Sequence, residues 1–356
     1  MKVTNTSVDF PAALALAQSG APLGADETRR LFDAIFTGRL SEEEIIAYLS
    51  ATADRKPTVE ELVGAVTSMR QHMRAVAAPA GAMDLCGTGG DGLGTLNIST
   101  AVSFVVAACG VPVAKHGNRS ASSRSGAADV LEALGIRIGL EPDSAASVLR
   151  EAGITFLFAQ THHPAMKHVG GARKQIGRRT IFNLLGPLAN PGRVTRQLVG
   201  VFSADWLVPY AQALKILGSE RAWIVHGRDG LDELSISGPT QVAYLDHGAI
   251  TTGEVTPEEA GLKRWPLADI AGGNAGHNAQ ALRSLLEGDA TGAYHQIVLL
   301  NAAAALNVAG KAQDLRQGAE MADEAIRSGR AHAAFNKLLI ASNRTASSSE
   351  AIDHSI

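Results

Sequence analysis

The residues best suited to chemistry in this sequence are concentrated between Asp84 and Arg119. Five glycines occupy positions 87, 89, 90, 92 and 94, within eight residues. Glycine adopts positive φ without steric cost, and a glycine loop leaves its backbone N–H groups open to an anion. Donor side chains follow in two groups, Asn97-Ile98-Ser99-Thr100 and Lys115-His116-Gly117-Asn118-Arg119. The loop and these donors predict a site for a polyanionic ligand that carries phosphate.

Two common phosphate-binding motifs do not account for this loop. Gly87-x-Gly89-x-x-Gly92 matches the dinucleotide fingerprint, which also needs an acidic residue about 20 positions on. No Asp or Glu lies between Asp91 and Asp129. The P-loop requires Gly-Lys-Ser/Thr after its glycines, and that tripeptide does not follow them here. A glycine-rich turn without function is the remaining alternative, and the convergent Lys, His and Arg residues argue against it.

The loop lies within a predicted βαβ unit. An apolar strand, Ala82–Cys86, precedes it, a helix over Ala101–Cys109 follows with Asn97 or Ser99 as its cap, and a second strand covers Val111–Ala114. The first N–H groups of such a helix are free to bind an anion. Because open α/β sheets bind ligands at the carboxyl ends of their strands, we expect the donors to meet at that edge.

Two adjacent acids, Asp232 and Glu233, follow a predicted strand at Ala222–Val225. Mg²⁺ is usually held by one or two carboxylates together with water and substrate oxygens. This pair can supply the carboxylates; an exposed hairpin is the structural alternative.

Asp91 in the glycine loop would repel phosphate unless it binds a metal or a ribose hydroxyl or caps the loop. The stretch 152–204 contains seven Lys and Arg and no acid, so it is either a solvated helical face or part of an anion site.

Hydrophobic periodicity divides the chain into a small helical domain and a larger α/β domain. Residues 1–80 show only helical patterns, with capping boxes at Ser41 and Thr58. Residues 81–342 alternate strands and helices, including a short strand at Ile136–Ile138, which predicts a mostly parallel central sheet flanked by helices. Helices from about 164 to 190 are expected to pack on the small domain, which is then discontinuous. The polar tail, 343–356, is expected to be disordered.

Composition narrows the class of protein. The net charge is −3 and aromatic residues make up 4% of the chain, which argues against a nucleic-acid partner. The longest apolar stretch, residues 297–310, is too short for a membrane span, and the first 19 residues do not read as a secretory signal. Cys86 and Cys109 are the only cysteines and lie among apolar residues, so they suggest buried thiols. We therefore expect a cytoplasmic protein that binds neither membrane nor nucleic acid.

Five segments in chain order resemble the anthranilate phosphoribosyltransferase family of tryptophan biosynthesis. They are Gly87-Thr88-Gly89-Gly90-Asp91, Asn97-Ile98-Ser99-Thr100, Lys115-His116-Gly117-Asn118-Arg119, the run from Arg178 to Leu188, and the run from Val225 to Glu233. The resemblance implies transfer of the phosphoribosyl group of 5-phosphoribosyl 1-pyrophosphate to the amine of anthranilate. It also implies a homodimer formed through the helical domain and Mg²⁺ as cofactor, two ions per subunit.

The same resemblance assigns roles to individual residues. Those for phosphoribosyl pyrophosphate are Gly87, Thr88, Gly89, Gly90, Asp91, Thr95, Asn97, Ser99, Thr100, Lys115 and Ser123. Those for anthranilate are Gly87, His116, Asn118, Arg173 and Pro187. The metal ligands are Ser99, Asp232 and Glu233, and the two acids and Lys115 are the catalytic residues. Gly170-Gly171-Ala172 precede Arg173 where this family commonly has a proline and a β-branched residue, so the backbone there is more flexible.

Three other classes are less consistent with the sequence. A pyrimidine nucleoside phosphorylase shares the Ser-Arg-Ser-Gly pattern at residues 123–126, but Leu85-Cys86 stand where that family has a Lys-His-Ser run. A non-catalytic nucleic-acid-binding relative should lack the acid pair. Phosphoribosyltransferases of the purine-salvage type place an acidic pair directly before the loop, and here only Asp84 precedes it.

Overall fold

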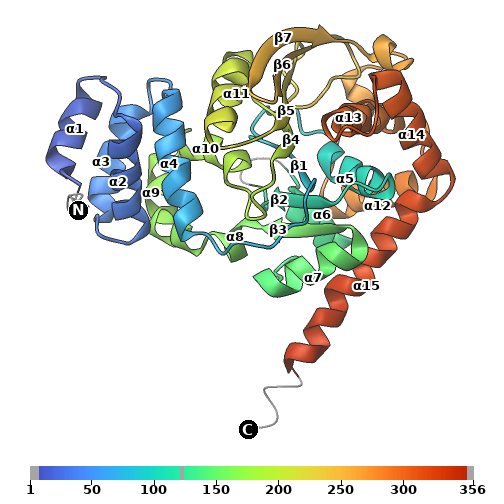
Figure 1. Ribbon diagram of the computed structural model, residues 1–356, viewed down its shortest axis with the longest axis horizontal. Helices are drawn as coiled ribbons and strands as arrows, with labels where there is room; N and C mark the ends of the chain where they lie inside the picture. Colours follow the sequence, from blue (N-terminus) through green and yellow to red (C-terminus); the bar gives the residue numbers. More distant parts are fainter. Residues whose placement is uncertain (1–7, 121–123, 351–356) are drawn as a thin grey trace.

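A sheet of seven strands runs through the larger part of the molecule in the computed structural model (Figure 1), which describes residues 8–120 and 124–350. The strand order is β3-β2-β1-β4-β5-β6-β7. The first five strands in this order are parallel, and β6 and β7 extend the sheet in antiparallel fashion. The strands are β1 (Met83–Gly87), β2 (Val113–Gly117), β3 (Ile154–Phe158), β4 (Arg196–Gly200), β5 (Arg221–Gly227), β6 (Thr240–Asp246) and β7 (Ala249–Val255).

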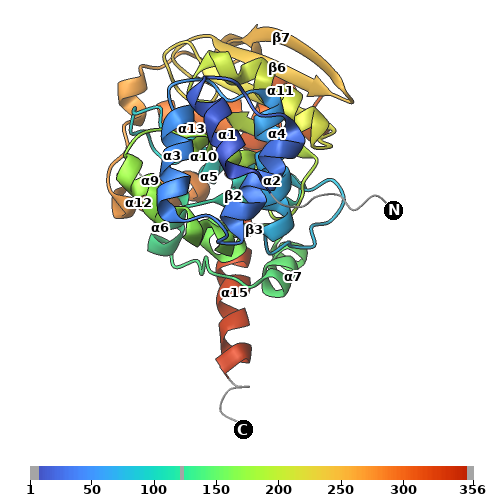
Figure 2. The ribbon, with the colours of Figure 1, turned by 90° about the vertical axis from the view of Figure 1, so that its left-hand side faces the viewer.

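Four helices form the N-terminal group, which stands to one side of the sheet (Figures 1 and 2). Capping boxes start two of them, because Ser41 and Thr58 accept from the N–H groups of Glu44 and Glu61. The helices are α1 (Phe10–Gln18), α2 (Ala25–Phe36), α3 (Glu42–Thr52) and α4 (Val59–His72). A turn of small residues then leads into β1.

Each face of the sheet is buried in a different core. Leu85, Leu198 and Val225 belong to the core that holds α5 and α13, whereas their neighbours Val199 and Ile224 belong to the core that holds α11 and the N-terminal helices. Side chains alternate across a strand with period two, so one sheet serves both cores. The helices of the first face are α5 (Ile98–Ala108), α6 (Ala127–Ala133), α7 (Pro142–Ala152), α12 (Ala275–Glu287), α13 (Ala293–Val308), α14 (Leu315–Arg327) and α15 (Arg330–Glu350).

The chain between β3 and β4 returns to the N-terminal helices. It contains α8 (Ala159–His162), the 3₁₀ helix η1 (Pro164–His168), α9 (Gly170–Ile176), α10 (Phe182–Leu185) and η2 (Pro187–Ala189). Of these, α9 packs on α3 and α10 packs on α4. The other face of the sheet is then covered by η3 (Ala204–Trp206) and α11 (Leu207–Ile216), and η4 (Pro257–Ala260) and η5 (Leu267–Ile270) lie in the connection from β7 to α12.

The structure corrects several predicted elements. Residues 136–138 form no strand; Ile136 and Ile138 are buried, but they do not pair with the edge strand β3. The helix α15 continues past Asn343 to Glu350, and the Asn343 amide donates to the carbonyl of Gly135 at 2.9 Å; the rest of the tail predicted to be disordered lies outside the described residues. The predicted helical region 164–188 is broken by a non-helical segment around Gly177.

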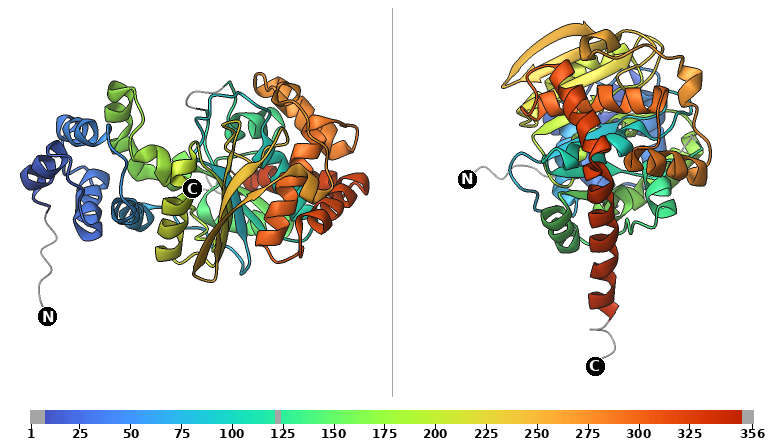
Figure 3. Two further views of the ribbon diagram at one scale, coloured as in Figure 1. Left: turned by 90° about the horizontal axis from the view of Figure 1, so that it is seen from above. Right: turned by 90° about the vertical axis from the view of Figure 1, so that its right-hand side faces the viewer.

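In the left-hand view of Figure 3 the N-terminal helices stand to one side of the sheet, and in the right-hand view the end of α15 extends below the rest of the molecule. In the described ranges no helix combines the length and the apolar character that crossing a bilayer requires.

Candidate active site

The glycine loop leaves the carboxyl end of β1 and is held open by its backbone. Gly89, Gly90, Gly92 and Gly94 all have positive φ, between 62° and 81°, which side chains other than glycine rarely tolerate. The N–H of Thr88 donates to the carbonyl of Gly200 at 2.9 Å, and the Thr88 hydroxyl accepts from Phe202 N at 3.1 Å. The start of the loop is therefore fixed to the end of β4.

The acid Asp232 reaches this loop from 143 residues away. Its Oδ2 accepts from the N–H of Gly89 at 2.9 Å. A Cβ at Gly87 would lie 2.8 Å from that oxygen, and a Cβ at Gly200 would lie 1.5 Å from the Asp232 carbonyl oxygen. The strand β4 must therefore end in glycine for the acid segment to approach, whereas a side chain at Gly87 would displace the Asp232 carboxylate.

Glu233 caps the helix that follows the loop. Its Oε1 accepts from the N–H of Ser99 at 3.2 Å, at the start of α5, where the helix dipole favours negative charge. The Lys115 ammonium donates to Ser99 Oγ at 3.1 Å and to the carbonyl of Leu85 at 2.5 Å. Lys115 is only 3% exposed. The structure thus brings Ser99, Lys115 and Glu233 together.

The acids are partly buried, and the protein compensates their charges poorly. Burial, followed by the charge of Asp91, raises the pKa of Asp232 to about 7. Burial, followed by the charge of Asp232, raises the pKa of Glu233 to about 8, against the opposing effect of Lys115. Burial lowers the pKa of Lys115, although Asp84 opposes that shift. A cation bound between these groups would favour the charged carboxylates.

This donor set fits Mg²⁺ that shares its coordination with a substrate. Within residues 8–120 and 124–350, no three His, Cys, Asp or Glu side chains are gathered to hold a metal by themselves. Two carboxylates and the Ser99 hydroxyl leave several positions for water and phosphate oxygens, which is how Mg²⁺ is usually bound. The arrangement is therefore suited to a metal that arrives with a phosphorylated ligand.

A second group of buried polar residues lies at the end of β2. His116 Nδ1 lies 3.0 Å from the carbonyl of Gly186, and its Nε2 has no hydrogen-bond partner among the residues that the structure describes. Asp84 Oδ1 accepts from the N–H of His116 at 3.0 Å, and Asp84 Oδ2 accepts from the Asn190 amide at 2.8 Å. The strand β2, the turn at Gly186-Pro187 and β1 are thereby linked through Asp84.

Several predicted ligands of phosphoribosyl pyrophosphate have partners within the protein. Asp91 caps the loop, because its Oδ1 accepts from Leu93 N at 3.1 Å. Thr95 forms an isolated bridge with Ala271. Asn97 occupies the N-cap position of α5 but does not cap it through its side chain; its Oδ1 accepts from the Asn278 amide at 2.8 Å.

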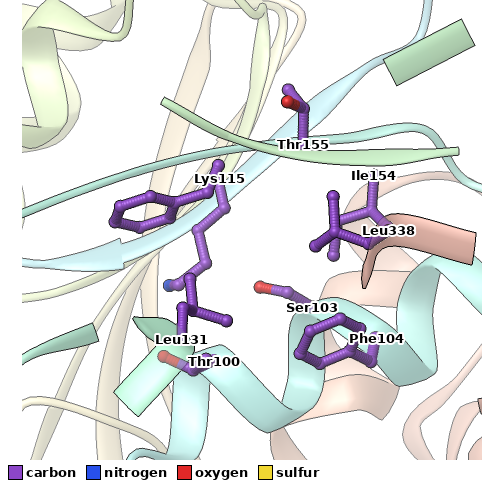
Figure 4. A pocket seen from close by; sticks show the side chains of 9 residues that line it. Thr100, Ser103, Phe104, Lys115, Leu131, Ile154, Thr155 and Leu338 are labelled. Carbon is purple, nitrogen blue, oxygen red and sulfur yellow. The ribbon is translucent and has the colours of Figure 1, made fainter. Parts of the chain in front are cut away.

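Thr100 lies deeper in the fold than the other predicted ligands. It is 2% exposed and, with Lys115 and Ser103, faces a void of about 10 Å³ between α5 and β2 (Figure 4). That volume is at the lower limit for a single water molecule. Ser123, also predicted as a ligand, lies outside the described residues.

The predicted acceptor residues are distributed over several elements. Asn118 Oδ1 accepts from Arg119 N at 2.8 Å, while Arg119 itself pairs with Asp129 and Glu132 on α6. The Arg173 guanidinium, on α9, lies over the ring of Phe182 at 5.7 Å from its centroid. Pro187 is buried in η2, and its carbonyl accepts from the Gln197 amide at 2.8 Å.

Four residues of this region were not predicted as functional. Asp84, Asn190 and Asn278 are buried polar side chains that orient predicted ligands. A signal for Asp84 is present in the sequence, since a lone acid within an apolar strand must have a specific partner. Arg179 donates to the carbonyl of Gly90 and lies 4.1 Å from the centroid of the Phe202 ring. Nothing in the local sequence indicates that contact.

Comparison with known proteins places the chain among named relatives. Residues 80–332 match the family model described as glycosyl transferase family, a/b domain, and residues 12–73 match its helical bundle domain. An anthranilate phosphoribosyltransferase of Rhodopseudomonas palustris is 54% identical over 94% of this chain and 99% of its own.

Solved structures agree with these relatives. The anthranilate phosphoribosyltransferase of Thermus thermophilus superposes with a TM-score of 0.88 at 39% identity, over 93% of this chain and 99% of its own. The enzyme of Saccharomyces cerevisiae in complex with PRPP and Mg superposes with a TM-score of 0.86 at 26% identity, over 94% of this chain and 98% of its own.

Proposed function

The chain belongs to the anthranilate phosphoribosyltransferases of the glycosyl transferase family, and we propose that its site joins 5-phosphoribosyl 1-pyrophosphate to anthranilate. The products are N-(5-phosphoribosyl)anthranilate and pyrophosphate, in the second step of tryptophan biosynthesis from chorismate. One observation supports this reaction above all others. The backbone N–H groups of Gly89 and Ser99 donate to Asp232 and Glu233, and the Lys115 ammonium donates to the hydroxyl of the same Ser99.

The reaction breaks the bond between C1′ of the ribose and the pyrophosphate oxygen. Negative charge develops on the leaving pyrophosphate while the ribose becomes oxocarbenium-like, so donors aimed at that charge lower the barrier. The open N–H groups of the glycine loop and the Lys115 ammonium supply such donors. Bound Mg²⁺ would neutralise the phosphate charge. Asp232 and Glu233, with the Ser99 hydroxyl, would hold that metal, and we assign two ions per subunit.

The acceptor amine forms the new C1′–N bond and then loses a proton. An arylamine is neutral near pH 7, so the site needs to orient the ring and its carboxylate more than it needs a strong base. Arg173 supplies a planar fork suited to the carboxylate. Asn118 and the Gly186-Pro187 turn would border the ring, and His116 would face it with the nitrogen that has no partner, Nε2.

We also propose that two copies of the chain associate through the N-terminal helices and that the enzyme works in the cytoplasm. The dimer is proposed from the family resemblance. The location is supported by Cys86 and Cys109, which are both free thiols and therefore suit a reducing compartment.

A direct assay tests the proposed function. Purified protein is incubated with phosphoribosyl pyrophosphate, Mg²⁺ and anthranilate, and the loss of anthranilate fluorescence is followed. We expect turnover that requires all three components and stops in excess chelator. Turnover that continues in chelator contradicts the metal assignment, and phosphorolysis of a pyrimidine nucleoside in the same preparation contradicts the reaction itself.

A further inference from the structure

A cavity of about 290 Å³ lies outside the site described above. It is bordered by the connection from α3 to α4, by the segment 179–184 and by the segment 202–206. These segments meet where the N-terminal helices approach the end of β4. A cavity of roughly 150 Å³ already accepts a benzene ring, so this one has room for a single ring with a polar substituent.

Aromatic side chains form part of the cavity wall. Tyr48, Phe202 and Trp206 all line it, and the rings of Phe202 and Trp206 meet edge to face at 6.5 Å. The Arg179 guanidinium covers the Phe202 ring at 4.1 Å. Aromatic walls with a guanidinium beside them suit a planar ligand, because rings stack on both surfaces.

The charges around the cavity favour an anion. Three cations line it, Arg55, Lys56 and Arg179, against two carboxylates, Asp54 and Glu61. Arg55 pairs with Glu61 in two hydrogen bonds of 2.7 and 2.5 Å. Lys56 pairs with Asp205. Arg179 is exposed and donates to the carbonyl of Gly90. Among the described residues it forms no ion pair with a carboxylate.

Two buried polar atoms of this wall lack partners. Thr180 is 8% exposed and lines the cavity, and within the described part of the chain its Oγ1 has no hydrogen-bond partner. Arg55 Nε is likewise buried without one. A buried donor without a partner costs free energy, and a ligand oxygen in the cavity would satisfy these groups.

We propose that this cavity binds a second small molecule, a single-ring aromatic carboxylate, separate from the substrates of the glycine-loop site. The carboxylate pairs with Arg179 and accepts from the Thr180 hydroxyl, and the ring lies among Tyr48, Phe202 and Trp206. Arg179 also holds the carbonyl of Gly90, so the ligand and the glycine loop share one guanidinium. A carboxylate there reduces the positive potential beside the loop, so occupancy weakens the binding of phosphoribosyl pyrophosphate. By linkage, each ligand weakens the other to the same extent.

Trp206 provides a reporter inside the cavity. The full chain carries three tryptophans, Trp206, Trp223 and Trp265, and replacing the last two with Phe leaves Trp206 as the only indole. We expect benzoate to change the Trp206 fluorescence in a saturable way. Methyl benzoate, which keeps the ring without the charge, should bind at least tenfold more weakly, since about 1.4 kcal/mol of charge pairing corresponds to a factor of ten.

Three variants in that background distinguish this cavity from the acceptor site. Arg179→Gln and Thr180→Val should each weaken benzoate binding, the former by about tenfold or more, whereas Arg173→Ala should leave it unchanged. Circular dichroism checks that each variant is folded. Loss of the signal in Arg173→Ala with retention in Arg179→Gln would mean that benzoate occupies the acceptor site, and the proposal would be wrong. Equal binding of methyl benzoate, tighter binding of inorganic phosphate, or no saturable signal would also overturn it.

The coupling is tested separately on the wild-type chain. Isothermal titration should show that saturating benzoate raises the dissociation constant of phosphoribosyl pyrophosphate in the absence of anthranilate. In Thr180→Val this rise in the dissociation constant should become smaller in proportion to the loss of benzoate binding. An unchanged constant at benzoate saturation, with the Trp206 signal present, would contradict the coupling while leaving the reaction itself untouched.

Discussion

At the residue scale, the site depends on acids whose charges are poorly compensated by the protein alone. Asp232 and Glu233 are held by two backbone N–H groups and by the nearby Lys115. Their raised pKa values mean that these acids bind protons more readily in the folded protein than in the unfolded chain. Protons and metal therefore compete for the same oxygens, which gives the acid pair two measurable properties, a metal affinity and a pH dependence.

Replacing both acids tests whether they bind the metal without being required for folding. The double variant Asp232→Asn, Glu233→Gln should lose the heat of Mg²⁺ binding in calorimetry and at least about 100-fold of the rate. Without metal at pH 8 it should be as stable as the wild type or more stable by roughly 1–3 kcal/mol, because buried charges have been removed. Glu254→Gln, on the exposed β7, is the matched control. An unchanged rate in the double variant would remove the metal assignment.

The same pair predicts how metal binding depends on pH. A carboxyl with a pKa of about 7 or 8 binds a proton through the range in which an ordinary carboxyl is ionised. The apparent affinity for Mg²⁺ should therefore fall as the pH is lowered from about 8 to about 6. Calorimetric titration at three pH values measures it. A pH-independent affinity would show that the two acids are already ionised before metal binds.

Arg173 tests whether acceptor and phosphate recognition are separate. Burial lowers the pKa of Arg173, so its charge is partly desolvated, and losing its carboxylate contact should cost roughly 2–5 kcal/mol. In Arg173→Ala the KM for anthranilate should then rise more than about tenfold, with little change in the KM for phosphoribosyl pyrophosphate. Arg173→Lys should recover only part of the loss, and Lys174→Ala is the control on the same helix. A raised KM for phosphoribosyl pyrophosphate with little change in the KM for anthranilate would place Arg173 at the phosphate site.

At the element scale, the site is formed where strands end and distant segments approach them. The βαβ unit around the glycine loop could be predicted because glycines and polar residues mark its boundaries, and the predicted strand Ala82–Cys86 is displaced by one residue from β1, Met83–Gly87. The short strand at Ile136–Ile138 could not be excluded, because apolar alternation reports burial and not pairing. The capping of α5 by Glu233 also escaped prediction, since the two partners are 134 residues apart and the local candidates were Asn97 and Ser99.

The end of β1 offers a test of this close approach. A Cβ in Gly87→Ala would lie 2.8 Å from Asp232 Oδ2 and 3.5 Å from the carbonyl of Gly200. The flexible carboxylate can move aside, so we expect a small change in melting temperature but a loss of about tenfold or more in Mg²⁺ affinity. Gly238→Ala, whose Cβ would meet no atom within 4 Å, should change neither. A Gly87→Ala variant with wild-type metal affinity would show that the position of Asp232 is not critical.

At the scale of the whole molecule, one core joins the N-terminal helices to the sheet. Phe32, Leu62, Tyr210 and Ile224 belong to the same buried cluster, so the helical group is not an independent appendage. The chain crosses between the two parts through the segment after α4, where the carbonyl of Arg74 accepts from His162 Nδ1 at 3.1 Å. The stability of that junction depends on a histidine that is fully buried.

This histidine makes the stability of the whole protein sensitive to acid. Burial lowers the pKa of His162 to about 4, against the opposing effect of its hydrogen bond to the Arg74 carbonyl, and the charge of His116 adds to the lowering. An unfolded histidine titrates near 6.5. Between these values the unfolded state binds more protons than the folded state, so the free energy of unfolding falls as the pH drops from about 6.5 to about 4. We expect this residue to account for roughly 1–3 kcal/mol of that fall.

His162→Gln provides the measurement, because glutamine can still donate to the Arg74 carbonyl but does not titrate. Urea unfolding at pH 7 and pH 4.5 should show a smaller loss of stability in the variant than in the wild type. The acid pair acts in the opposite direction, since its raised pKa values favour the folded state as the pH falls from about 8; it is present in both proteins and cancels in the comparison. His247→Gln, at an exposed turn, is the control. Equal losses in the wild type and in His162→Gln would mean that His162 has the same pKa in the folded and the unfolded protein, and that its burial does not contribute to the acid sensitivity of the fold.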